Sequence, residues 1–367
     1  MYALVRPLFF ALSPHAAHGL ATAALSPLEY VAPLRAVARA LFRPRDPRLA
    51  TRLLGIDFPS PVGLAGGFDK NALRPRALAA LGFGHLELGT VTARAQAANP
   101  LPNLFRLPSD RALINRLGFP NEGASRVVHR IASRAPGVGV PIGVSIGKSR
   151  DVALEPLEPV IADYVTSLRE ALTVASFVVV NVSSPNTKNL RAMQGASLAR
   201  ALLSALVAEN RASPRPRPML VKIAPDLDDG ELENLLAVIE EVGLDGVVAT
   251  NTTIARRGLA TSAREVDAMG AGGLSGPPLR ARALDIVTRV RARLGTKIAV
   301  IGVGGIERGE HALAMLRAGA DLVQMYTGMI YEGPLVAWSM NRALSRAMTR
   351  DGAKSIAELV GHRVTAP

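Results

Sequence analysis

The stretch VVVNVSSPNT, residues 178–187, begins as an apolar run and ends in polar turn residues. A short Val-rich run bounded by Asn, Ser and Pro is typical of a buried β-strand. Asn, Ser and Pro commonly follow such a strand, because their side chains or fixed φ angle suit a turning backbone. One strand of this kind is compatible with many folds, so its meaning depends on whether the pattern recurs.

The pattern does recur, in eight segments separated by helical patterns. The segments are PVGLAG from residue 61, HLELGTV from 85, PIGVSIG from 141, FVVVNVS from 177, MLVKIAP from 219, GVVATNT from 246, KIAVIGV from 297 and LVQMYTG from 322. Alternating strands and helices imply parallel strands, and eight units predict an α/β fold of the (β/α)8 TIM-barrel type. An open doubly wound sheet is the alternative, but GVGGIERG does not have the G-x-G-x-x-G spacing and comes late in the chain.

Residues 1–44 are predicted to form a short N-terminal helical extension of two or three helices. The dipeptides Ser13-Pro14 and Ser26-Pro27 are each typical of an N-cap followed by a first-turn proline. Polar residues interrupt the apolar run, so it is too short to span a membrane. A signal peptide is the alternative, and a proline and two histidines within its apolar region disfavour it.

The rest of the chain is predicted to be one barrel domain, residues 45–350, with a peripheral C-terminal tail, residues 351–367. A long insertion, residues 93–118, follows the second strand. Long loops at the carboxyl ends of barrel strands often cover the active site. We therefore expect this insertion to lie over the functional end of the barrel.

The composition restricts the chemistry. The net charge of +13 and the pI near 10.8 allow a nucleic-acid partner, but clustered basic runs with interleaved aromatic residues are few, so we expect a solvated basic surface and no nucleic acid. The chain has no cysteine, which excludes disulfides, thiolate nucleophiles and Cys-held metals or iron–sulfur clusters. The six histidines show no metal-binding spacing.

Polar residues follow the eight strands, where the active sites of such barrels lie. Glycine turns at Gly304-Gly305 and at Tyr326-Thr327-Gly328 offer backbone N–H groups suited to a phosphate. Lys222 lies inside a strand, where a solvated lysine is hard to explain, whereas Lys148 is expected to reach solvent. An ammonium group suits an anion that forms during a reaction, such as a reduced flavin.

Four asparagines lie at the same predicted rim, namely Asn115, Asn181, Asn186 and Asn251. A single Asn would be a cap or a turn residue. Four together would complement a ring whose edge alternates C=O and N–H groups, because each amide carries both an acceptor and a donor. A pyrimidine-dione has such an edge.

Nine motifs in this order resemble the quinone-dependent (class 2) dihydroorotate dehydrogenases. The motifs are GLAGGFDKN, GTVT, NRLGF, NVSSPNT, VKIAPDL, ATNTT, GGLSG, IGVGGI and VQMYTG, and PLFFALSPHAAHGL resembles the quinone-binding extension of that class. The resemblance implies oxidation of (S)-dihydroorotate to orotate in UMP synthesis, with FMN as hydride acceptor and a membrane quinone as final acceptor. It implies peripheral association with the cytoplasmic side of a bacterial inner membrane and no obligate protein partner.

The resemblance also assigns roles to residues. Ser184 corresponds to the base that takes a proton from the substrate, with Thr187 and Phe119 on the path by which the proton leaves. The substrate positions are Lys70, Asn115, Arg116, Leu117, Gly118, Phe119, Asn181, Asn186, Asn251 and Thr252. The FMN positions are Gly66, Gly67, Phe68, Asp69, Lys70, Thr90, Ser145, Asn181, Lys222, Thr250, Gly276, Gly305, Tyr326 and Thr327. The quinone-tunnel positions are His18, Arg106 and Tyr326, and no metal site is implied.

Three positions depart from the family pattern. Ser145 stands where Asn is usual, which shortens one expected FMN contact, Thr327 replaces a commoner Ser, and Pro120 follows Phe119 where Asn is usual.

Soluble class 1 relatives and tRNA-dihydrouridine-synthase-like barrels are the alternatives. Both use a catalytic cysteine, which this chain does not contain.

Overall fold

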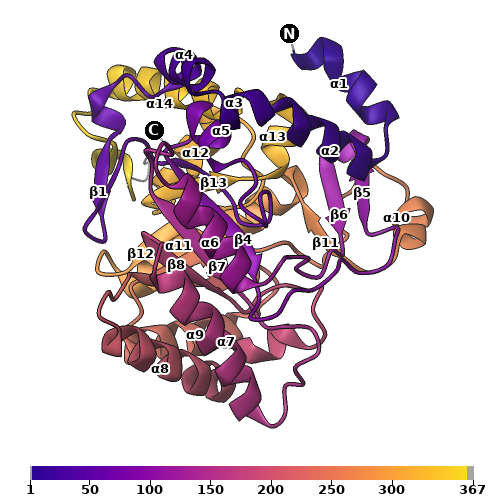
Figure 1. The fold of residues 1–367 in the computed structure, drawn as a ribbon, viewed down its shortest axis with the longest axis vertical. Coiled ribbons are helices and arrows are strands. Elements are labelled where there is room, and N and C mark those ends of the chain that lie inside the picture. Colours follow the sequence, from indigo (N-terminus) through magenta and orange to yellow (C-terminus); the bar gives the residue numbers. More distant parts are fainter. Residues whose placement is uncertain (1, 362–367) are drawn as a thin grey trace.

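Eight parallel strands close into a barrel in the computed structural model, which describes residues 2–361 (Figure 1). In chain order, which is also their order around the barrel, the strands are β3 (Val62–Leu64), β4 (His85–Val91), β7 (Ile142–Ile146), β8 (Phe177–Asn181), β9 (Met219–Ile223), β10 (Gly246–Ala249), β12 (Ala299–Val303) and β13 (Leu322–Met325). The last strand closes the ring by pairing with the first, with Gln324 in register with Gly63. Each strand lies in one of the eight predicted segments, so the predicted TIM barrel is confirmed.

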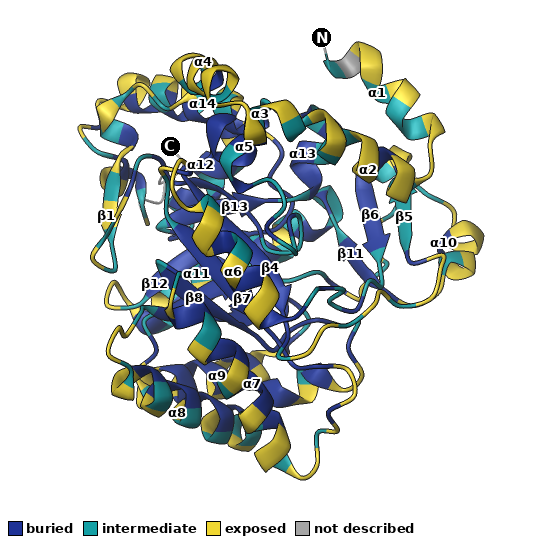
Figure 2. Ribbon diagram, in the orientation of Figure 1, coloured by how far each residue is buried: buried dark blue, intermediate teal, exposed yellow. Residues whose placement is uncertain are grey.

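An outer layer of helices surrounds the strands, with buried faces turned inward and exposed faces outward (Figure 2). The larger ones are α6 (Ala124–Arg134), α7 (Leu157–Leu172), α8 (Ala196–Ala212), α9 (Asp229–Val242), α11 (Arg280–Leu294), α12 (Gly309–Arg317) and α14 (Val336–Asp351), and the shorter ones are α5 (Pro75–Ala80), α10 (Ala263–Met269) and α13 (Thr327–Glu332). Local sequence sets several boundaries. Asp228 and Glu231, for example, form a capping box at the start of α9, and Gly243 ends it in a left-handed conformation.

Aromatic rings fill the amino-terminal end of the barrel. Phe58, on the hairpin formed by β1 (Thr51–Leu53) and β2 (Ile56–Phe58), packs against His85 and Phe177 with ring centroids 5.5 and 6.4 Å away. A Cβ atom at Gly143 would lie 2.3 Å from the Phe177 ring, so that glycine makes room for the ring. Burial lowers the pKa of His85 to about 3, so its ring is neutral. With this end filled, a ligand can enter only from the carboxyl ends of the strands.

The insertion at residues 93–118 is more ordered than the expected loop. It forms a hairpin of β5 (Leu104–Leu107) and β6 (Ala112–Asn115), which extends by pairing β6 with β11 (Gly273–Ser275). These strands were not predicted because each is only three or four residues long, which is too short for a clear alternating pattern. Asn115 is the last residue of β6, the middle strand of this small sheet.

The N-terminal extension has four helices, which corrects the predicted two or three. They are α1 (Tyr2–Ala11), α2 (Pro14–Ala24), α3 (Ser26–Tyr30) and α4 (Ala32–Phe42). The Ser13 hydroxyl caps α2 as predicted, accepting from the Ala16 N–H at 3.2 Å. Ser26 is not a cap, because it is already the first residue of α3 and its hydroxyl accepts from Arg74 Nη2 at 2.8 Å. Among the described helices, each is too short or too polar to cross a membrane.

A buried carboxylate fastens the extension to the barrel. Glu29 on α3 is fully buried and accepts from the Ala77 N–H of α5 at 3.1 Å. Burial raises the pKa of Glu29, and Arg134 opposes that effect from 3.9 Å. At the other end of the extension, the Tyr2 hydroxyl donates to the carbonyl of Ile330 at 2.7 Å. Contacts from α3 and from the first residue of α1 therefore attach the extension to the barrel.

The prediction of a peripheral C-terminal tail is wrong for part of residues 351–367. α14 ends at Asp351, and the following residues Ala353, Ile356 and Leu359 are buried in the main hydrophobic core. Residues 362–367 lie outside the described part of the chain. The core thus continues beyond the last helix because three apolar side chains fold back onto it.

The close packing of Phe177 on Gly143 gives a stability prediction. Gly143→Ala should lower the free energy of unfolding by about 1–3 kcal/mol, because the added methyl group overpacks a rigid interior. Gly230→Ala is the control, since its Cβ would meet the nearest atom at 3.5 Å, an ordinary contact. Thermal and urea unfolding of both variants would measure this. Equal stability of the two variants would show that the ring can move aside freely.

Candidate active site

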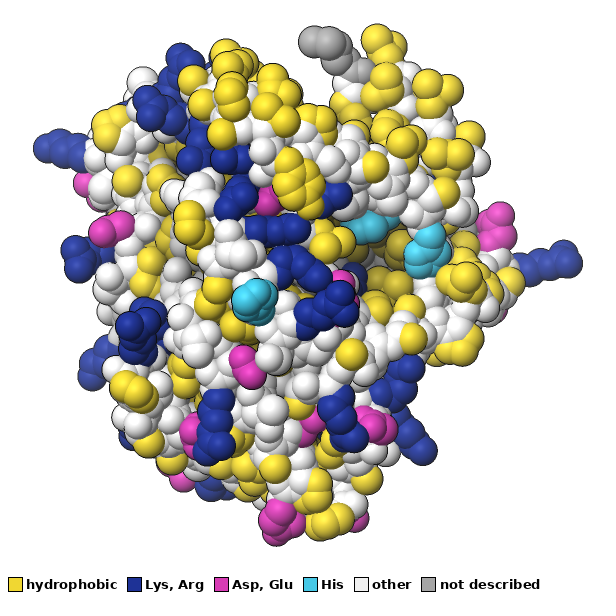
Figure 3. All heavy atoms as spheres, in the orientation of Figure 1, with side chains coloured by type: hydrophobic (Ala, Val, Ile, Leu, Met, Phe, Trp, Pro, Cys, Tyr) yellow, Lys and Arg dark blue, Asp and Glu magenta, His cyan; other side chains and the backbone are white. Residues whose placement is uncertain are grey.

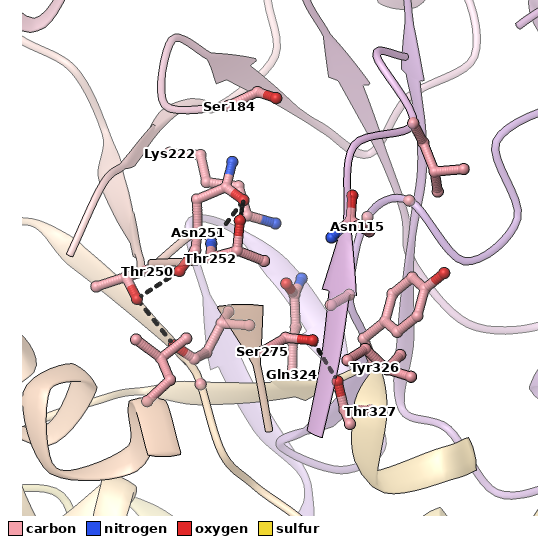
Figure 4. A pocket seen from close by; sticks show the side chains of 18 of the residues that line it. Asn115, Ser184, Lys222, Thr250, Asn251, Thr252, Ser275, Gln324, Tyr326 and Thr327 are labelled. Carbon is pink, nitrogen blue, oxygen red and sulfur yellow. Dashed lines mark hydrogen bonds between the residues drawn. The ribbon is translucent and has the colours of Figure 1, made fainter. Parts of the chain in front are cut away.

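A cavity of about 1040 Å³, its open mouth included, lies at the carboxyl ends of the barrel strands (Figure 4). Most of the predicted site residues line it. These are Gly66, Gly67, Lys70, Thr90, Asn115, Leu117, Gly118, Phe119, Asn181, Ser184, Asn186, Lys222, Thr250, Asn251, Thr252, Gly276, Gly305, Tyr326 and Thr327. Residues more than 250 positions apart in the chain thus meet in one space, because all eight strand ends lie at one edge of the ring.

The four asparagines hold one another in position. Asn186 Nδ2 donates to Asn115 Oδ1 at 3.0 Å, which joins the loop after β8 to the small antiparallel sheet. Asn251 Nδ2 donates to Asn181 Oδ1 at 3.3 Å, which joins the ends of β10 and β8. Asn186 Oδ1 is buried and has no hydrogen-bond partner among the described protein atoms. A buried acceptor of this kind is normally satisfied by water or a ligand.

A second chain of hydrogen bonds runs beneath the asparagines. Asn181 Nδ2 donates to Thr90 Oγ1 at 3.0 Å, and Thr90 Oγ1 lies 2.9 Å from Ser145 Oγ. Asn181 and Thr90 line the cavity, whereas Ser145 is fully buried behind Thr90 and outside the lining. Ser145, which stands where Asn is usual in the family, was predicted to contact FMN, and the structure corrects this prediction because the side chain lies behind Thr90 and supports it.

Two lysines point into the cavity from different strand ends. Lys222 Nζ lies 3.1 Å from Glu87 Oε1 in a buried ion pair inside the barrel. Lys70 Nζ donates to the carbonyl of Gly67, and burial lowers the pKa of Lys70 to about 8, although the Asp69 carboxylate raises it. The expectation for Lys148 was wrong, because that side chain is 2% exposed and donates to the carbonyls of Ser149 and Val152.

Ser184 lies on the loop after β8, buried to 4% exposure, with its side chain at the cavity (Figure 4). Its Oγ accepts from the Asn186 N–H at 3.2 Å, so the loop itself orients the hydroxyl. Thr187, three residues further, lies outside the cavity lining, and its buried Oγ1 has no partner among the described protein atoms. Phe119 lines the cavity with a left-handed backbone, φ 53°.

Glycine turns line the opposite side of the cavity. Gly276 and Gly305 have φ angles of 100° and 66°, which strongly favour glycine. Thr327 Oγ1 donates to Ser275 Oγ at 2.8 Å (Figure 4), linking the turn after β13 to β11. Burial raises the pKa of Tyr326 to about 12, so its hydroxyl stays protonated. Hydroxyls and backbone donors at this side suit an anionic group.

A second cavity, of about 920 Å³ with its open mouth included, lies between α2 and the barrel. It shares Lys70, Leu104, Leu117 and Tyr326 with the first cavity. His18 lines it with its ring against Phe68, at 5.6 Å between centroids, and burial lowers the pKa of His18 to about 4, helped by Lys70 and His15. The ring is therefore neutral at physiological pH.

Besides Ser145, four predicted residues lie elsewhere than expected. Phe68 and Asp69 line the second cavity and not the first, and Asp69 accepts from the N–H groups of Leu73 and Arg74. Arg116 points away from the cavity, because its guanidinium lies over the Phe105 ring and donates to the carbonyl of Ala271 at 2.8 Å. Arg106 lines neither cavity. It lies over Phe10 and donates to the Leu12 carbonyl at 2.9 Å, which holds the end of α1.

Some lining residues were not predicted. They include Ala65, Leu104, Leu113, Ser275, Leu279, Val303, Ile306, Gln324 and Met325. Gln324 is the most informative, because both amide atoms are buried without a partner among the described residues. The sequence did carry a signal for Gln324, because it is a polar residue between apolar neighbours in the strand segment LVQM.

Known proteins resemble this chain over nearly its full length. Residues 48–348 match the family model described as dihydroorotate dehydrogenase. A dihydroorotate dehydrogenase (quinone) of Thermobifida fusca is 50% identical over 348 residues, covering 94% of this chain and 92% of that protein. Another of the same description, from Nocardia farcinica, is 47% identical and covers 100% and 99%.

A solved structure agrees with the sequence comparisons. The crystal structure of DHODH in complex with ferulenol from Eimeria tenella superposes with a TM-score of 0.84 at 33% identity, covering 95% of each chain. The barrel, the cavity and these similarities lead to one assignment. The chain belongs to the dihydroorotate dehydrogenase family.

Proposed function

We propose that this protein oxidises (S)-dihydroorotate to orotate in pyrimidine biosynthesis, with FMN as hydride acceptor and a membrane quinone as final acceptor. The observation that supports this most is the meeting of Ser184, Lys70 and the four asparagines in one cavity that shares a wall with a second. The names of the relatives support the quinone dependence.

The residues around the first cavity fit FMN. The unpartnered amide of Gln324 and the ammonium of Lys222 suit the polar edge of the isoalloxazine ring, together with Thr90, Asn181 and Thr250. The glycine turns with Gly276, Gly305 and Thr327 suit the phosphate. When bound, FMN supplies a hydride acceptor that can pass electrons on to a quinone.

The substrate would occupy the space between Asn115 and Asn251. Amide side chains bind the alternating C=O and N–H edge of a dihydropyrimidine-dione, because each can donate and accept. The free acceptor of Asn186 suits a ring N–H. Protonated Lys70 would pair with the carboxylate of dihydroorotate, which turns the ring toward Ser184.

Ser184 would accept the proton that leaves the substrate ring. A serine hydroxyl is a weak base, so the proton needs a way out. Thr187 lies three residues away with a buried hydroxyl that has no partner among the described protein atoms, and Phe119 lines the cavity. We propose that Thr187 hands the proton to water while Phe119 keeps bulk water from the reacting ring.

The second cavity would hold the quinone, and the extension would lie on the membrane. Ten of the twelve exposed large hydrophobic residues among those described lie in the extension, namely Leu4, Val5, Leu8, Leu12, Leu20, Tyr30, Val31, Leu34, Val37 and Leu41. In Figure 3 hydrophobic side chains gather over α1, α2 and α4, with Lys and Arg side chains beside them. An apolar surface beside basic charge suits the interface of an anionic bilayer. We propose peripheral association with the cytoplasmic side of a bacterial inner membrane.

The role of Ser184 can be tested with a single substitution. Ser184→Ala should slow flavin reduction by dihydroorotate roughly 100-fold or more, the usual contribution of a positioned base, while FMN stays bound. Anaerobic stopped-flow absorbance would measure this, with Ser197→Ala on the exposed face of α8 as control. Rapid reduction in the Ser184 variant would remove the serine from the mechanism, and a colourless wild-type protein would contradict the proposed function.

The protonation of Lys70 should make orotate binding depend on pH. Its pKa of about 8 means that the ammonium form, which pairs with the substrate carboxylate, is present below that pH and lost above it. Orotate affinity should therefore be constant from pH 6 to 7 and fall up to tenfold per pH unit above about 8. Titration of the flavin absorbance with orotate would show this, and Lys70→Met should bind weakly without the inflection. A flat wild-type profile to pH 9 would contradict the role of Lys70.

The proposed membrane contact can be tested by placing a negative charge on the exposed apolar face of α4. Leu34→Glu and Val37→Glu on α4 should each reduce co-sedimentation with vesicles of phosphatidylglycerol and phosphatidylethanolamine, because a carboxylate opposes insertion among acidic headgroups. Leu101→Glu, at an exposed leucine outside the extension, is the matched control. Vesicle binding that is equal in all three variants would place the membrane contact on another surface.

A further inference from the structure

The side chain of Asn99, in the turn before β5, connects two segments that line the first cavity. Its Nδ2 donates to the carbonyl of Arg116 at 2.8 Å and to the carbonyl of Asn186 at 3.3 Å. Its backbone N–H donates to the carbonyl of Leu117 at 3.0 Å. One amide therefore joins residues 115–119, at the end of β6, to residues 184–187, on the loop after β8.

Gly118 leaves the space that this amide occupies. A Cβ atom at Gly118 would lie 2.7 Å from Asn99 Nδ2 and from Asn99 Oδ1. Gly118 also has φ 72°, which favours glycine. The backbone beside the substrate space is thus shaped around the side chain of Asn99, and Asn99 itself is outside the cavity lining.

Asn103 links this turn to the N-terminal extension. Asn103 is fully buried, and its Nδ2 donates to the carbonyl of Asn99 at 2.6 Å. Because that nitrogen faces a carbonyl, the Asn103 Oδ1 atom is the one that lies 2.7 Å from His15 Nε2. His15 must then donate through Nε2. His15 belongs to α2 and lines the second cavity.

We propose that Asn99 is a positioning residue for the substrate site, and that Asn103 and His15 tie its position to helix α2. Three residues form a continuous bridge from the second cavity to the loop of Asn186, whose N–H holds the Ser184 hydroxyl. The His15 side chain bonds to the Asn103 side chain, which bonds to the backbone carbonyl of Asn99, and the Asn99 side chain bonds to the carbonyl of Asn186. The extension thereby helps to order the dihydroorotate site as well as the quinone site. This inference rests on the proposed function for the identity of the two ligands.

The bridge can be broken at the end far from the substrate. His15→Ala and Asn103→Leu should each weaken orotate binding roughly three- to tenfold, the effect of losing one buried hydrogen bond. They should also raise the apparent Kd for dihydroorotate in the reduction of the flavin, which is measured in single turnovers without quinone. Orotate binding is followed by the flavin absorbance shift. His15→Gln keeps a donor on a side chain of similar reach and should restore most of the affinity.

Ser13→Ala is the matched control, because it removes the cap of the same helix without touching the bridge. It should lower the melting temperature about as much as His15→Ala and leave orotate affinity unchanged. Asn99→Leu tests the centre of the bridge. If it does not fold, the variants at His15 and Asn103 still decide the question.

The outcomes separate the two proposals. Wild-type protein that neither binds orotate nor is reduced by dihydroorotate would overturn the proposed function. Normal wild-type behaviour with orotate affinity in His15→Ala and Asn103→Leu equal to the wild type would overturn the bridge alone. Weakened binding in Ser13→Ala to the same extent would also overturn it, since the effect would then follow from a looser helix.

Discussion

Closure of the parallel ring is the constraint on which the rest of the structure depends. Because all the strands are parallel, their carboxyl ends lie at the same edge, and the pairing of β13 with β3 closes that edge into a ring. Residues distant in the chain, such as Lys70, Asn181 and Tyr326, therefore line one cavity there. The aromatic rings at the amino-terminal end and the glycines that accommodate them leave a single polar end to the barrel. Local packing at one end thus defines where chemistry can occur at the other.

Most polar side chains at the carboxyl end of the barrel are hydrogen-bonded to one another. The few buried polar atoms without a partner indicate the kind of ligand that fits there. Asparagine, serine and threonine side chains bond to one another from four strands, which keeps each in place before anything binds. An unpaired buried polar group costs about 1–3 kcal/mol. The open atoms of Gln324 and Asn186 therefore indicate that water or a polar ligand completes the network. Preorganised donors and acceptors are what the proposed chemistry requires, because they need no rearrangement during the reaction.

The extension joins the barrel through polar and apolar contacts and still leaves many of its large apolar residues exposed. Glu29 and Tyr2 bind backbone groups of the barrel, while leucines and valines of α1 and α4 remain exposed. A water-soluble surface would rarely keep so many large apolar side chains together. Helix α2 of the same extension lines the second cavity, so the surface proposed to face the membrane and the cavity proposed for the quinone belong to one segment of the chain.

The sequence by itself determined the eight strands, the rim residues and the cap at Ser13, because periodicity and turn chemistry act over a few neighbouring residues. Motif resemblance added the family. The tertiary structure alone decided which way long side chains turn, so Arg116, Arg106 and Lys148 lie where the sequence did not place them. It also decided the hairpin in the insertion, the burial of Ala353, Ile356 and Leu359, and the contact between His15 and Asn103, which are 88 positions apart. Such contacts depend on which surfaces the closed barrel brings together, and no local pattern records that.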